Sequence, residues 1–319
     1  MNKILFRADA NNQIGLGHMI RCLALAERLK NQFECVIAML RPANNIAEYV
    51  NAHNIPLLSL DNEDDIYNEK IKYDIIVLDG YHFLPSMQKK LKNNGKKLVC
   101  IDDLVDKHYY ADVVINHANS LNKTQFSVES YTKLYLGEKF TILRAAFYKQ
   151  KECKKEQRSV FICFGGADVN GFASFFVSIC DKVSQINSIH VVFSLDDVAA
   201  KISVRSSKLK IHKNLDAHEM ANLMSRCELC IGPASNIALE ALASNCKLIT
   251  GLTADNQKNI YMGIKSAKGV YPVGIFQKKS SKFYEEIIDS ALNKVVDSRK
   301  KYEICGDSLI NVFLSLVND

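Results

Sequence analysis

The sequence predicts an α/β protein of two Rossmann-like lobes, in which two parallel sheets wrapped by helices face each other across a cleft. Its 319 residues exceed what a single hydrophobic core usually organises. Short aliphatic or β-branched runs alternate with helical segments up to about residue 145, and a similar series begins again at residue 159. We therefore expect an N-terminal lobe at 1–148, a linker at 149–158, a C-terminal lobe at 159–280 and closing helices at 281–319.

The first lobe is expected to open with a strand, a glycine turn and an amphipathic helix. In that helix Ile20, Leu23 and Ala24 recur at a spacing that buries one face, while Glu27 and Arg28 belong to the solvated face. The strands of this lobe are predicted at 4–7, 35–39, 75–79, 98–102 and 113–116.

The linker is predicted from KQKECKKEQR, which carries clustered charge without apolar periodicity. The strands of the second lobe are predicted at 159–163, 189–193, 209–212, 229–231 and 247–250. Its helices are predicted from about 170, then at 217–226, 235–243 and 257–268, with closing helices at 283–295 and 298–317. Residues 275–282 are expected to form a mobile connector.

The composition is that of a globular protein, with 48% hydrophobic and 24% charged residues. A net charge of +6, spread over scattered lysines, favours anionic small ligands and predicts no nucleic-acid partner. No apolar run is long enough to span a bilayer and no signal-type segment opens the chain, so a cytoplasmic location is expected. Cys227 and Cys230 form a C-x-x-C without a second pair at metal-ligand spacing, and we interpret them as structural thiols.

The turn Gly15-Leu16-Gly17-His18 is the first candidate site. Glycines permit a tight turn and a close approach of the backbone to a ligand. His18 falls at a helix start, where the positive dipole favours a neutral imidazole that can accept a proton. The alternative is an ordinary turn with a capping histidine. Ile20 stands where the third glycine of G-x-G-x-x-G would be, so no dinucleotide cofactor is predicted.

Three further candidates follow strands of the second lobe. The turn with Gly165 and Gly166 could present backbone N–H groups to a phosphate, or it could simply need a positive φ. Ser235 and Asn236 precede a helix that carries Glu240, whose carboxylate could bind both ribose hydroxyls or merely complement the helix dipole. The polar triplet Asp255-Asn256-Gln257 could hold sugar and phosphate oxygens or cap a helix.

In the first lobe, Asp79 and Tyr81 end one predicted strand, and Asp102 and Asp103 end another. Every candidate cluster thus falls at the carboxyl end of a strand, where open α/β sheets bind ligands. We expect the second lobe to bind a nucleoside diphosphate whose attached group reaches the first lobe.

The order of seven segments resembles the UDP-sugar hydrolase family of the pseudaminic acid pathway, which acts on UDP-2,4-diacetamido-2,4,6-trideoxy-β-L-altropyranose. The segments are RADANNQIGLGHMIRCLALA, LDGYHF, IDD, YLGEKFTILRAAF, ICFGGAD, GPASNIALEAL and DNQ, and they extend to about residue 260. The second lobe is also similar to the UDP-GlcNAc transferase that makes the lipid II precursor. Both resemblances imply a glycosyltransferase-B-like fold.

The resemblance implies hydrolysis of the anomeric C–O bond with inversion, releasing UDP and free sugar for nonulosonic acid biosynthesis and surface or flagellin glycosylation. His18 matches the catalytic histidine, Tyr81 a second active-site residue and Glu240 the ribose ligand. No metal and no cofactor are implied. Residues matching the diphosphate region are Gly165, Gly166, Ser235, Asn256 and Gln257. Further substrate-binding candidates are Asp9, Gly15, Gly17, Arg21, Asp79, Arg144 and Asn236.

Two other functions remain open from the sequence. A glycosyltransferase of the same fold would use the same UDP site but would need an acceptor groove, and the first lobe shows no apolar loop of that kind. A nucleotide-sugar binding protein would bind UDP tightly without turnover.

Overall fold

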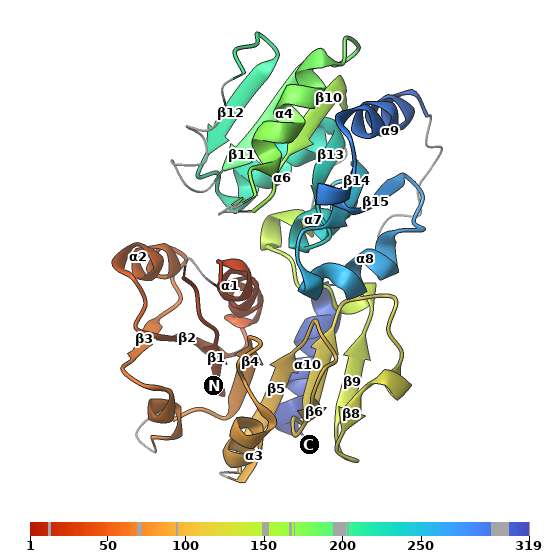
Figure 1. Ribbon diagram of the computed structural model, residues 1–319. Coiled ribbons are helices and arrows are strands. Elements are labelled where there is room, and N and C mark those ends of the chain that lie inside the picture. Colours follow the sequence, from red (N-terminus) through yellow and green to blue (C-terminus); the bar gives the residue numbers. More distant parts are fainter. Residues whose placement is uncertain are drawn as a thin grey trace. The chain divides into compact units, whose positions relative to one another are not determined.

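The chain forms two compact units, each built on its own parallel sheet. The computed structural model describes residues 1–11, 14–68, 72–93, 95–148, 153–165, 168, 170–193, 202, 204–294 and 306–318. Unit 1 comprises Met1–Ala145 and Ile304–Asp319, and unit 2 comprises Ala146–Glu303. Figure 1 shows strands in the interior of each unit with helices around them. The predicted α/β class with two parallel sheets is confirmed.

Unit 1 is organised around a seven-stranded sheet of order β3-β2-β1-β4-β5-β7-β9. Its strands are β1 (Lys3–Arg7), β2 (Glu34–Leu40), β3 (Leu57–Leu60), β4 (Ile75–Asp79), β5 (Lys97–Ile101), β7 (Val113–Asn116) and β9 (Lys133–Leu136). Two short strands, β6 (His108–Tyr109) and β8 (Ser127–Val128), pair separately. The helices are α1 (Gly17–Leu29), α2 (Asn44–Ala52), α3 (Pro85–Asn93) and α10 (Gly306–Asn318), with 3-10 turns η1 (Glu63–Tyr67), η2 (Lys123–Gln125) and η3 (Glu138–Phe140). A further 3-10 turn, η4 (Ala145–Phe147), lies where the chain passes from unit 1 to unit 2.

The central strands β1, β4, β5 and β7 are buried on both faces, as expected for a parallel sheet covered by helices. On one face Phe6 packs in a core with Leu25 of α1 and Phe313 of α10. On the other face Leu5 packs in a core with Leu91 of α3. Alternation along β1 therefore supplies both cores.

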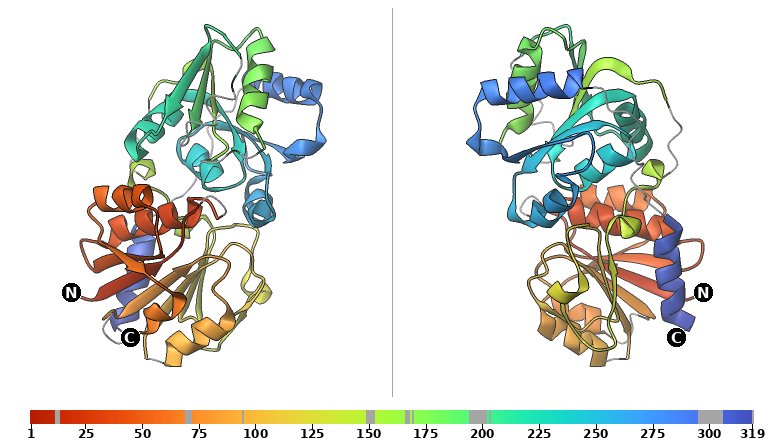
Figure 2. Two further views of the ribbon diagram at one scale, coloured as in Figure 1. Left: turned by 60° about the vertical axis from the view of Figure 1, so that its left-hand side comes forward. Right: turned by 90° about the vertical axis from the view of Figure 1, so that its right-hand side faces the viewer.

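The last helix, α10, belongs to unit 1, far along the chain from the rest of that unit. The Phe313 ring lies 6.4 Å from the Phe33 ring, between their centroids. Figure 2 shows α10 against the sheet of unit 1, whereas α9 lies with unit 2. The expected C-terminal segment 281–319 is thus divided between the units, because the apolar face of α10 completes the core of unit 1.

Unit 2 is organised around a six-stranded parallel sheet of order β12-β11-β10-β13-β14-β15. Its strands are β10 (Glu156–Ile162), β11 (Ser188–Phe193), β12 (Leu209–Lys213), β13 (Cys227–Pro233), β14 (Lys247–Leu252) and β15 (Val270–Ile275). Its helices are α4 (Phe172–Lys182), α6 (Ala217–Arg226), α7 (Asn236–Ala243), α8 (Lys258–Ile264) and α9 (Ser281–Asn293), with 3-10 turns η5 (Asp255–Gln257) and η6 (Phe276–Lys278).

The segment expected to be a mobile connector, 275–282, is anchored instead. Phe276 is buried, and its ring packs against those of Phe164 and Phe176 at centroid distances of 5.2 and 5.4 Å. The hydroxyl of Tyr284 donates a hydrogen bond to the carbonyl of Phe276. An aromatic cluster therefore fixes the chain between β15 and α9.

The expected linker, 149–158, overlaps the first strand of unit 2. Residues 149–152 lie outside the described part of the chain, but β10 begins at Glu156. The backbone N–H of Arg158 donates to Oε2 of Glu228 at 2.7 Å, and the Arg226 guanidinium pairs with Glu156. The Glu156 carboxylate thus has a cationic partner, and the backbone of this segment is hydrogen-bonded, so the charged sequence is compatible with a strand.

The strand orders place a topological switch point in each sheet. In unit 1 the chain moves outward from β1 to β3 and then returns to pair β4 with β1. In unit 2 it moves from β10 to β12 and returns to pair β13 with β10. Loops diverge at the carboxyl ends of the two strands on either side of such a point, which leaves room for a ligand. None of the described helices combines the length and apolar character needed to cross a membrane.

Candidate active site

The switch point of unit 1 joins the glycine turn after β1 to the loop after β4. The backbone N–H of Gly15 donates to the carbonyl of Asn11 at 2.8 Å, and Gly15 has a φ of 80°, which favours glycine. A Cβ built on Gly15 or Gly17 would meet nothing within 4 Å. Helix α1 then begins at Gly17 without a side-chain cap or an acidic residue in its first turn. The turn therefore leaves open space beside Gly15 and Gly17, and no side chain in the described part of the chain caps the first amides of α1 at the carboxyl edge of the sheet.

His18, the second residue of α1, is held by a buried carboxylate. Its Nδ1 lies 2.7 Å from Oδ1 of Asp79, the last residue of β4. His18 is 7% exposed and Asp79 is fully buried. A carboxylate oxygen at this distance requires a donor, so Nδ1 carries a proton, and in the neutral ring Nε2 has the lone pair. His18 can therefore act as a base through Nε2.

Arg21, one turn further along α1, links this pair to a second carboxylate. Its guanidinium donates to both oxygens of Asp79, at 2.6 and 2.7 Å, and to both oxygens of Asp103, at 2.7 and 2.9 Å. Burial by itself would raise the pKa of Asp103, but the Arg21 guanidinium holds it well below its usual range. The same balance lowers the pKa of Asp79. Asp79 contacts His18 directly, and Arg21 holds Asp79 in place. Substrate binding by Arg21 and Asp79 stays a prediction.

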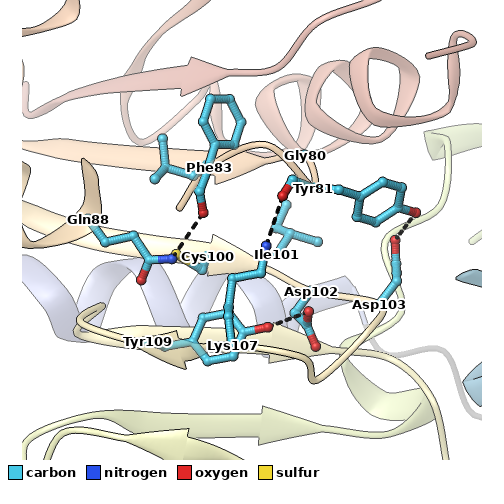
Figure 3. A pocket seen from close by; sticks show the side chains of 11 residues that line it. Gly80, Tyr81, Phe83, Gln88, Cys100, Ile101, Asp102, Asp103, Lys107 and Tyr109 are labelled. Atoms are coloured by element: carbon cyan, nitrogen blue, oxygen red, sulfur yellow. Dashed lines mark hydrogen bonds between the residues drawn. The ribbon is translucent and has the colours of Figure 1, made fainter. Parts of the chain in front are cut away.

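Tyr81 lies over His18 and shares Asp103 with Arg21. The two rings meet edge to face, with centroids 4.6 Å apart and planes at 82°. The Tyr81 hydroxyl donates to Oδ2 of Asp103 at 3.2 Å, and the residue is 37% exposed. Figure 3 shows the Tyr81 side chain directed toward Asp103 and Nζ of Lys107 reaching the Tyr81 carbonyl, 3.0 Å away. Tyr81 and His18, which the sequence singled out together, are therefore brought into contact.

The neighbouring aspartates have separate roles. Asp102 accepts hydrogen bonds from the Tyr109 hydroxyl, the Asn116 amide and the backbone N–H of Val105 at 3.1 Å. These contacts tie β5 to the segments that follow it, so Asp102 is structural. Only Asp103 joins the network around His18.

His117, which was not predicted as a site residue, lies next to Asp103 of this network. Its Nε2 is buried 3.8 Å from Oδ1 of Asp103 and has no hydrogen-bond partner within the described part of the chain. Burial and the nearby Arg21 guanidinium lower the pKa of His117 to about 4. Its position directly after β7 is the signal that could have identified it, since this is the same sheet edge.

Beside the His18 network lies a second cluster, formed by Arg7, Asp9, Glu63 and His82. Arg7 is fully buried and donates to Oδ1 of Asp9 at 2.5 Å and to Oε1 of Glu63 at 2.6 Å. Ligand atoms of Asp9, Glu63 and His82 lie within 4.8 Å of one another, as a metal site would require. The Arg7 guanidinium already supplies positive charge to both carboxylates. We therefore interpret Asp9, expected to bind substrate, as part of an ion-paired support.

In unit 2 the predicted residues follow three neighbouring strands. Gly165 follows β10 in a turn with a φ of 84°, as only glycine readily adopts, while Gly166 lies outside the described residues. Asp168 accepts from the backbone N–H groups of Phe172 and Ala173, at 3.0 and 2.8 Å, and so caps α4.

Ser235 occupies the N-cap position of α7 but its side chain makes no capping hydrogen bond. The first amides of the helix, from Asn236 onward, therefore lack a side-chain cap at the switch point. Glu240 is buried one turn into α7. Gln257 accepts from the backbone N–H of Thr253 at 2.8 Å, and the neighbouring Asn256 lies in the same turn, η5.

Arg144 is half-buried, just before η4, at the end of the continuous part of unit 1. The cysteines of the C-x-x-C are buried, and burial raises the pKa of both the Cys227 and the Cys230 thiol. Their structural interpretation agrees with this environment.

Comparison with known proteins identifies distant relatives. No protein-family model matches the chain. It is 27% identical over 279 residues to an uncharacterized protein of Methanocaldococcus jannaschii, covering 81% of this chain and 57% of the archaeal protein. It is 25% identical over 253 residues to UDP-2,4-diacetamido-2,4,6-trideoxy-beta-L-altropyranose hydrolase of Campylobacter jejuni, covering 75% of this chain and 88% of the hydrolase. The spore coat polysaccharide biosynthesis protein SpsG of Bacillus subtilis is 25% identical over 70% of this chain and 69% of SpsG. The resemblance found in the sequence is confirmed.

Solved structures match nearly the whole chain. MurG of Acinetobacter baumannii has a TM-score of 0.66 at 12% identity, covering 98% of this chain and 99% of MurG. Anabaena HepE, solved with UDP and glucose, has a TM-score of 0.62 at 13% identity, covering the full length of both chains. The fold is therefore that of the glycosyltransferase-B proteins.

Proposed function

We propose that the chain hydrolyses the anomeric C–O bond of a UDP-linked 2,4-diacetamido-2,4,6-trideoxy sugar, with inversion, and releases UDP and free sugar. The observation that carries the proposal is the His18–Asp79 pair at 2.7 Å, at the switch point of unit 1 and in contact with Tyr81. The Campylobacter jejuni hydrolase and SpsG support an activity on nucleotide sugars.

The proposed reaction begins with a water molecule on Nε2 of His18. As the water oxygen bonds to the anomeric carbon, its proton passes to Nε2, and the bond from that carbon to the β-phosphate oxygen breaks. The bond electrons leave with UDP, and attack from the opposite face inverts the anomeric centre. Asp79 holds Nδ1 and stabilises the imidazolium that forms. A positioned base of this kind is worth roughly 10²- to 10⁴-fold in rate.

Unit 2 is proposed to bind the UDP. The leaving group gains negative charge as the bond breaks, and preorganised N–H groups stabilise such charge. The turn at Gly165 and the start of α7 offer these groups on the strands flanking the switch point. Glu240, on the same helix, is proposed to bind the ribose hydroxyls. These donors carry the phosphate charge without a cation, so we expect turnover to persist in EDTA.

The test is incubation with UDP-linked diacetamido sugars in ¹⁸O-labelled water, followed by NMR and mass spectrometry. We expect UDP without label and a sugar labelled in its anomeric hydroxyl oxygen, first formed as the inverted anomer. Label in UDP would show P–O cleavage, and a sugar transferred only when an acceptor is added would show a glycosyltransferase. Binding without turnover on the whole panel would favour a binding protein.

The variants that test the mechanism are His18→Ala and a matched control, His108→Ala. His108 also pairs with a carboxylate, since its Nε2 lies 2.9 Å from Oε1 of Glu129, but its strand, β6, is not part of the sheet that contains the switch point. We expect His18→Ala to lose at least 10²-fold in kcat while His108→Ala keeps full activity. Full turnover by folded His18→Ala would contradict the mechanism. The free sugar would serve as a substrate for nonulosonic (pseudaminic) acid synthesis.

A further inference from the structure

His82 is an imidazole at the same sheet edge that the proposed reaction does not use. It follows Tyr81 in the loop after β4, and its Nε2 lies 3.2 Å from Oδ2 of Asp9. Its side chain is 40% exposed, whereas that of Asp9 is 10% exposed. The residue thus joins a buried carboxylate to the accessible edge of unit 1.

Asp9 is firmly fixed. Its Oδ1 accepts from the Arg7 guanidinium at 2.5 Å and from the backbone N–H of Leu40 at 2.9 Å. Burial alone would raise the pKa of Asp9, but the hydrogen bond from His82 and the Arg7 guanidinium hold it well below its usual range. Asp9 is therefore ionised and can only accept hydrogen bonds.

This fixes the tautomer of His82. Because Nε2 faces an ionised carboxylate, it carries the proton, and in the neutral ring Nδ1 is an acceptor. Among the described residues, the contacts of His82 are to Asp9 through Nε2 and to Phe83 through the ring. The Nδ1–Cε1 edge borders Gly80, where an added Cβ would lie 3.2 and 3.0 Å from these two atoms. Glycine at position 80 therefore leaves room for the ring in this orientation.

The loop that carries His82 is held on both sides. Nζ of Lys107 donates to the carbonyl of Tyr81 at 3.0 Å, and the Gln88 amide contacts the carbonyl of Phe83 at 3.4 Å, as Figure 3 shows. The His82 ring also packs on the Phe83 ring, with centroids 4.0 Å apart. The acceptor at Nδ1 is therefore preorganised next to Tyr81 and, through it, His18.

We propose that His82 is a substrate-recognition residue whose Nδ1 accepts a hydrogen bond from the N–H of an acetamido group on the sugar. The proposal rests on the proposed function and adds to it the group that reads the sugar. An amide N–H can donate a hydrogen bond but cannot accept one, so it complements a nitrogen that can only accept. A deoxy analogue without the N–H would leave the site with an unpaired acceptor.

The proposal predicts that replacing His82 weakens binding of the UDP-sugar but not of UDP. In a His18→Ala background, which prevents turnover, calorimetry would give the Kd of UDP and of UDP-2,4-diacetamido-2,4,6-trideoxy-β-L-altropyranose. Adding His82→Ala should raise the Kd of the UDP-sugar about tenfold and leave that of UDP unchanged. In the active protein the same change should lower kcat/KM about tenfold, while the control His108→Ala changes neither quantity.

Two conservative variants separate recognition from support of Asp9. Gln at position 82 can place its amide N–H where Nε2 lies but has no atom at Nδ1, whereas Asn can place its amide oxygen near Nδ1 but cannot reach Asp9. We expect His82→Asn to recover part of the affinity and His82→Gln to recover none.

Three results would each overturn the proposal. His82→Gln alone could recover the affinity, or His82→Ala could bind the UDP-sugar as tightly as the native residue does. In the third, EDTA abolishes UDP-sugar binding by the native protein and Zn²⁺ restores it. If the native protein binds the UDP-sugar without hydrolysing it, the proposed function fails while the Kd series still decides the role of His82. If the native protein binds no UDP-sugar, both fail.

Discussion

Replacement of Arg21 by Met tests whether the His18 network depends on its buried charge. Arg21 is 5% exposed and makes four hydrogen bonds to Asp79 and Asp103. Met matches the aliphatic part of the Arg side chain, ends near the position of Nε and carries no charge. The variant therefore leaves two buried carboxylates without their cation.

The expected cost is large for a single substitution. Removing one partner of a buried ion pair destabilises proteins by about 3–5 kcal/mol, because an uncompensated charge stays behind. In a unit of this size each kcal/mol lowers the Tm by roughly 2–4 °C, so a decrease of about 6–20 °C is expected. The matched control is Arg28→Met on the same helix, whose partner Asp307 is 3.5 Å away with a side chain that is 87% exposed. Exposed pairs of this kind contribute at most about 1 kcal/mol.

The pH dependence has opposite signs in the two proteins. In the native protein the pKa values of Asp79 and Asp103 are lowered, so their stabilisation is present above about pH 4 and is lost as the pH falls through the folded values. Without Arg21, burial raises both pKa values. The variant then loses stability as the pH rises through those raised values and regains it on acidification.

The assay is urea unfolding, followed by circular dichroism at about pH 7.5 and about pH 4.5. The free energy of unfolding of Arg21→Met should lie furthest below that of the native protein at the higher pH, and the gap should narrow at the lower pH. A gap below 1 kcal/mol at neutral pH, or one that widens on acidification, would refute the role of Arg21 as the buried counter-ion.

Three other outcomes are expected. Tyr81→Phe removes the hydroxyl that donates to Asp103 but keeps the ring on His18, so kcat should fall about tenfold with a nearly unchanged Tm; steady-state kinetics with thermal melts checks this. Gly232→Ala would place a Cβ 2.7 Å from the carbonyl oxygen of Cys163, the residue after β10. The free energy of unfolding should therefore fall by about 1–3 kcal/mol, which urea unfolding measures. Burial lowers the pKa of His190 to about 4, so its folded form loses stability as the pH falls from about 6.5, and His190→Gln should flatten that part of a Tm-against-pH curve.

The sequence predicted the parts of the fold that local patterns determine. The strands Ile75–Asp79 and Val113–Asn116 and the helix Ala217–Arg226 have the predicted bounds, because each is a clear apolar or amphipathic run. Strands β3 and β15 were missed, since LLSL and VYPVGI are short and interrupted by polar residues or proline. The return of α10 to unit 1 depends on contacts more than 200 residues apart in sequence, such as Phe33 with Phe313. No local pattern carries that information.

The site shows the same division. The sequence placed Asp79 and Tyr81 at a strand end and His18 in the turn that leads from a strand into a helix, and in parallel sheets such positions meet at one edge. It could not show that Arg21 would form ion pairs with Asp79 and Asp103, because ion pairing depends on which side chains the strand order brings together. His82 and His117 were missed because a single histidine after a strand has many explanations without its partner.

His18 and His82, at the same sheet edge, each face a carboxylate, but with different ring nitrogens. Each rests on a carboxylate that a buried arginine holds ionised: Asp79 by Arg21 and Asp9 by Arg7. His18 meets its carboxylate through Nδ1 and His82 through Nε2, so the first retains Nε2 and the second Nδ1 for other partners. A lysine could supply the charge but not the paired, planar donors that engage two carboxylates at once. The buried arginines thus keep both carboxylates ionised, and the orientation of each ring determines which nitrogen faces its carboxylate. The proposed chemistry and recognition both depend on this arrangement.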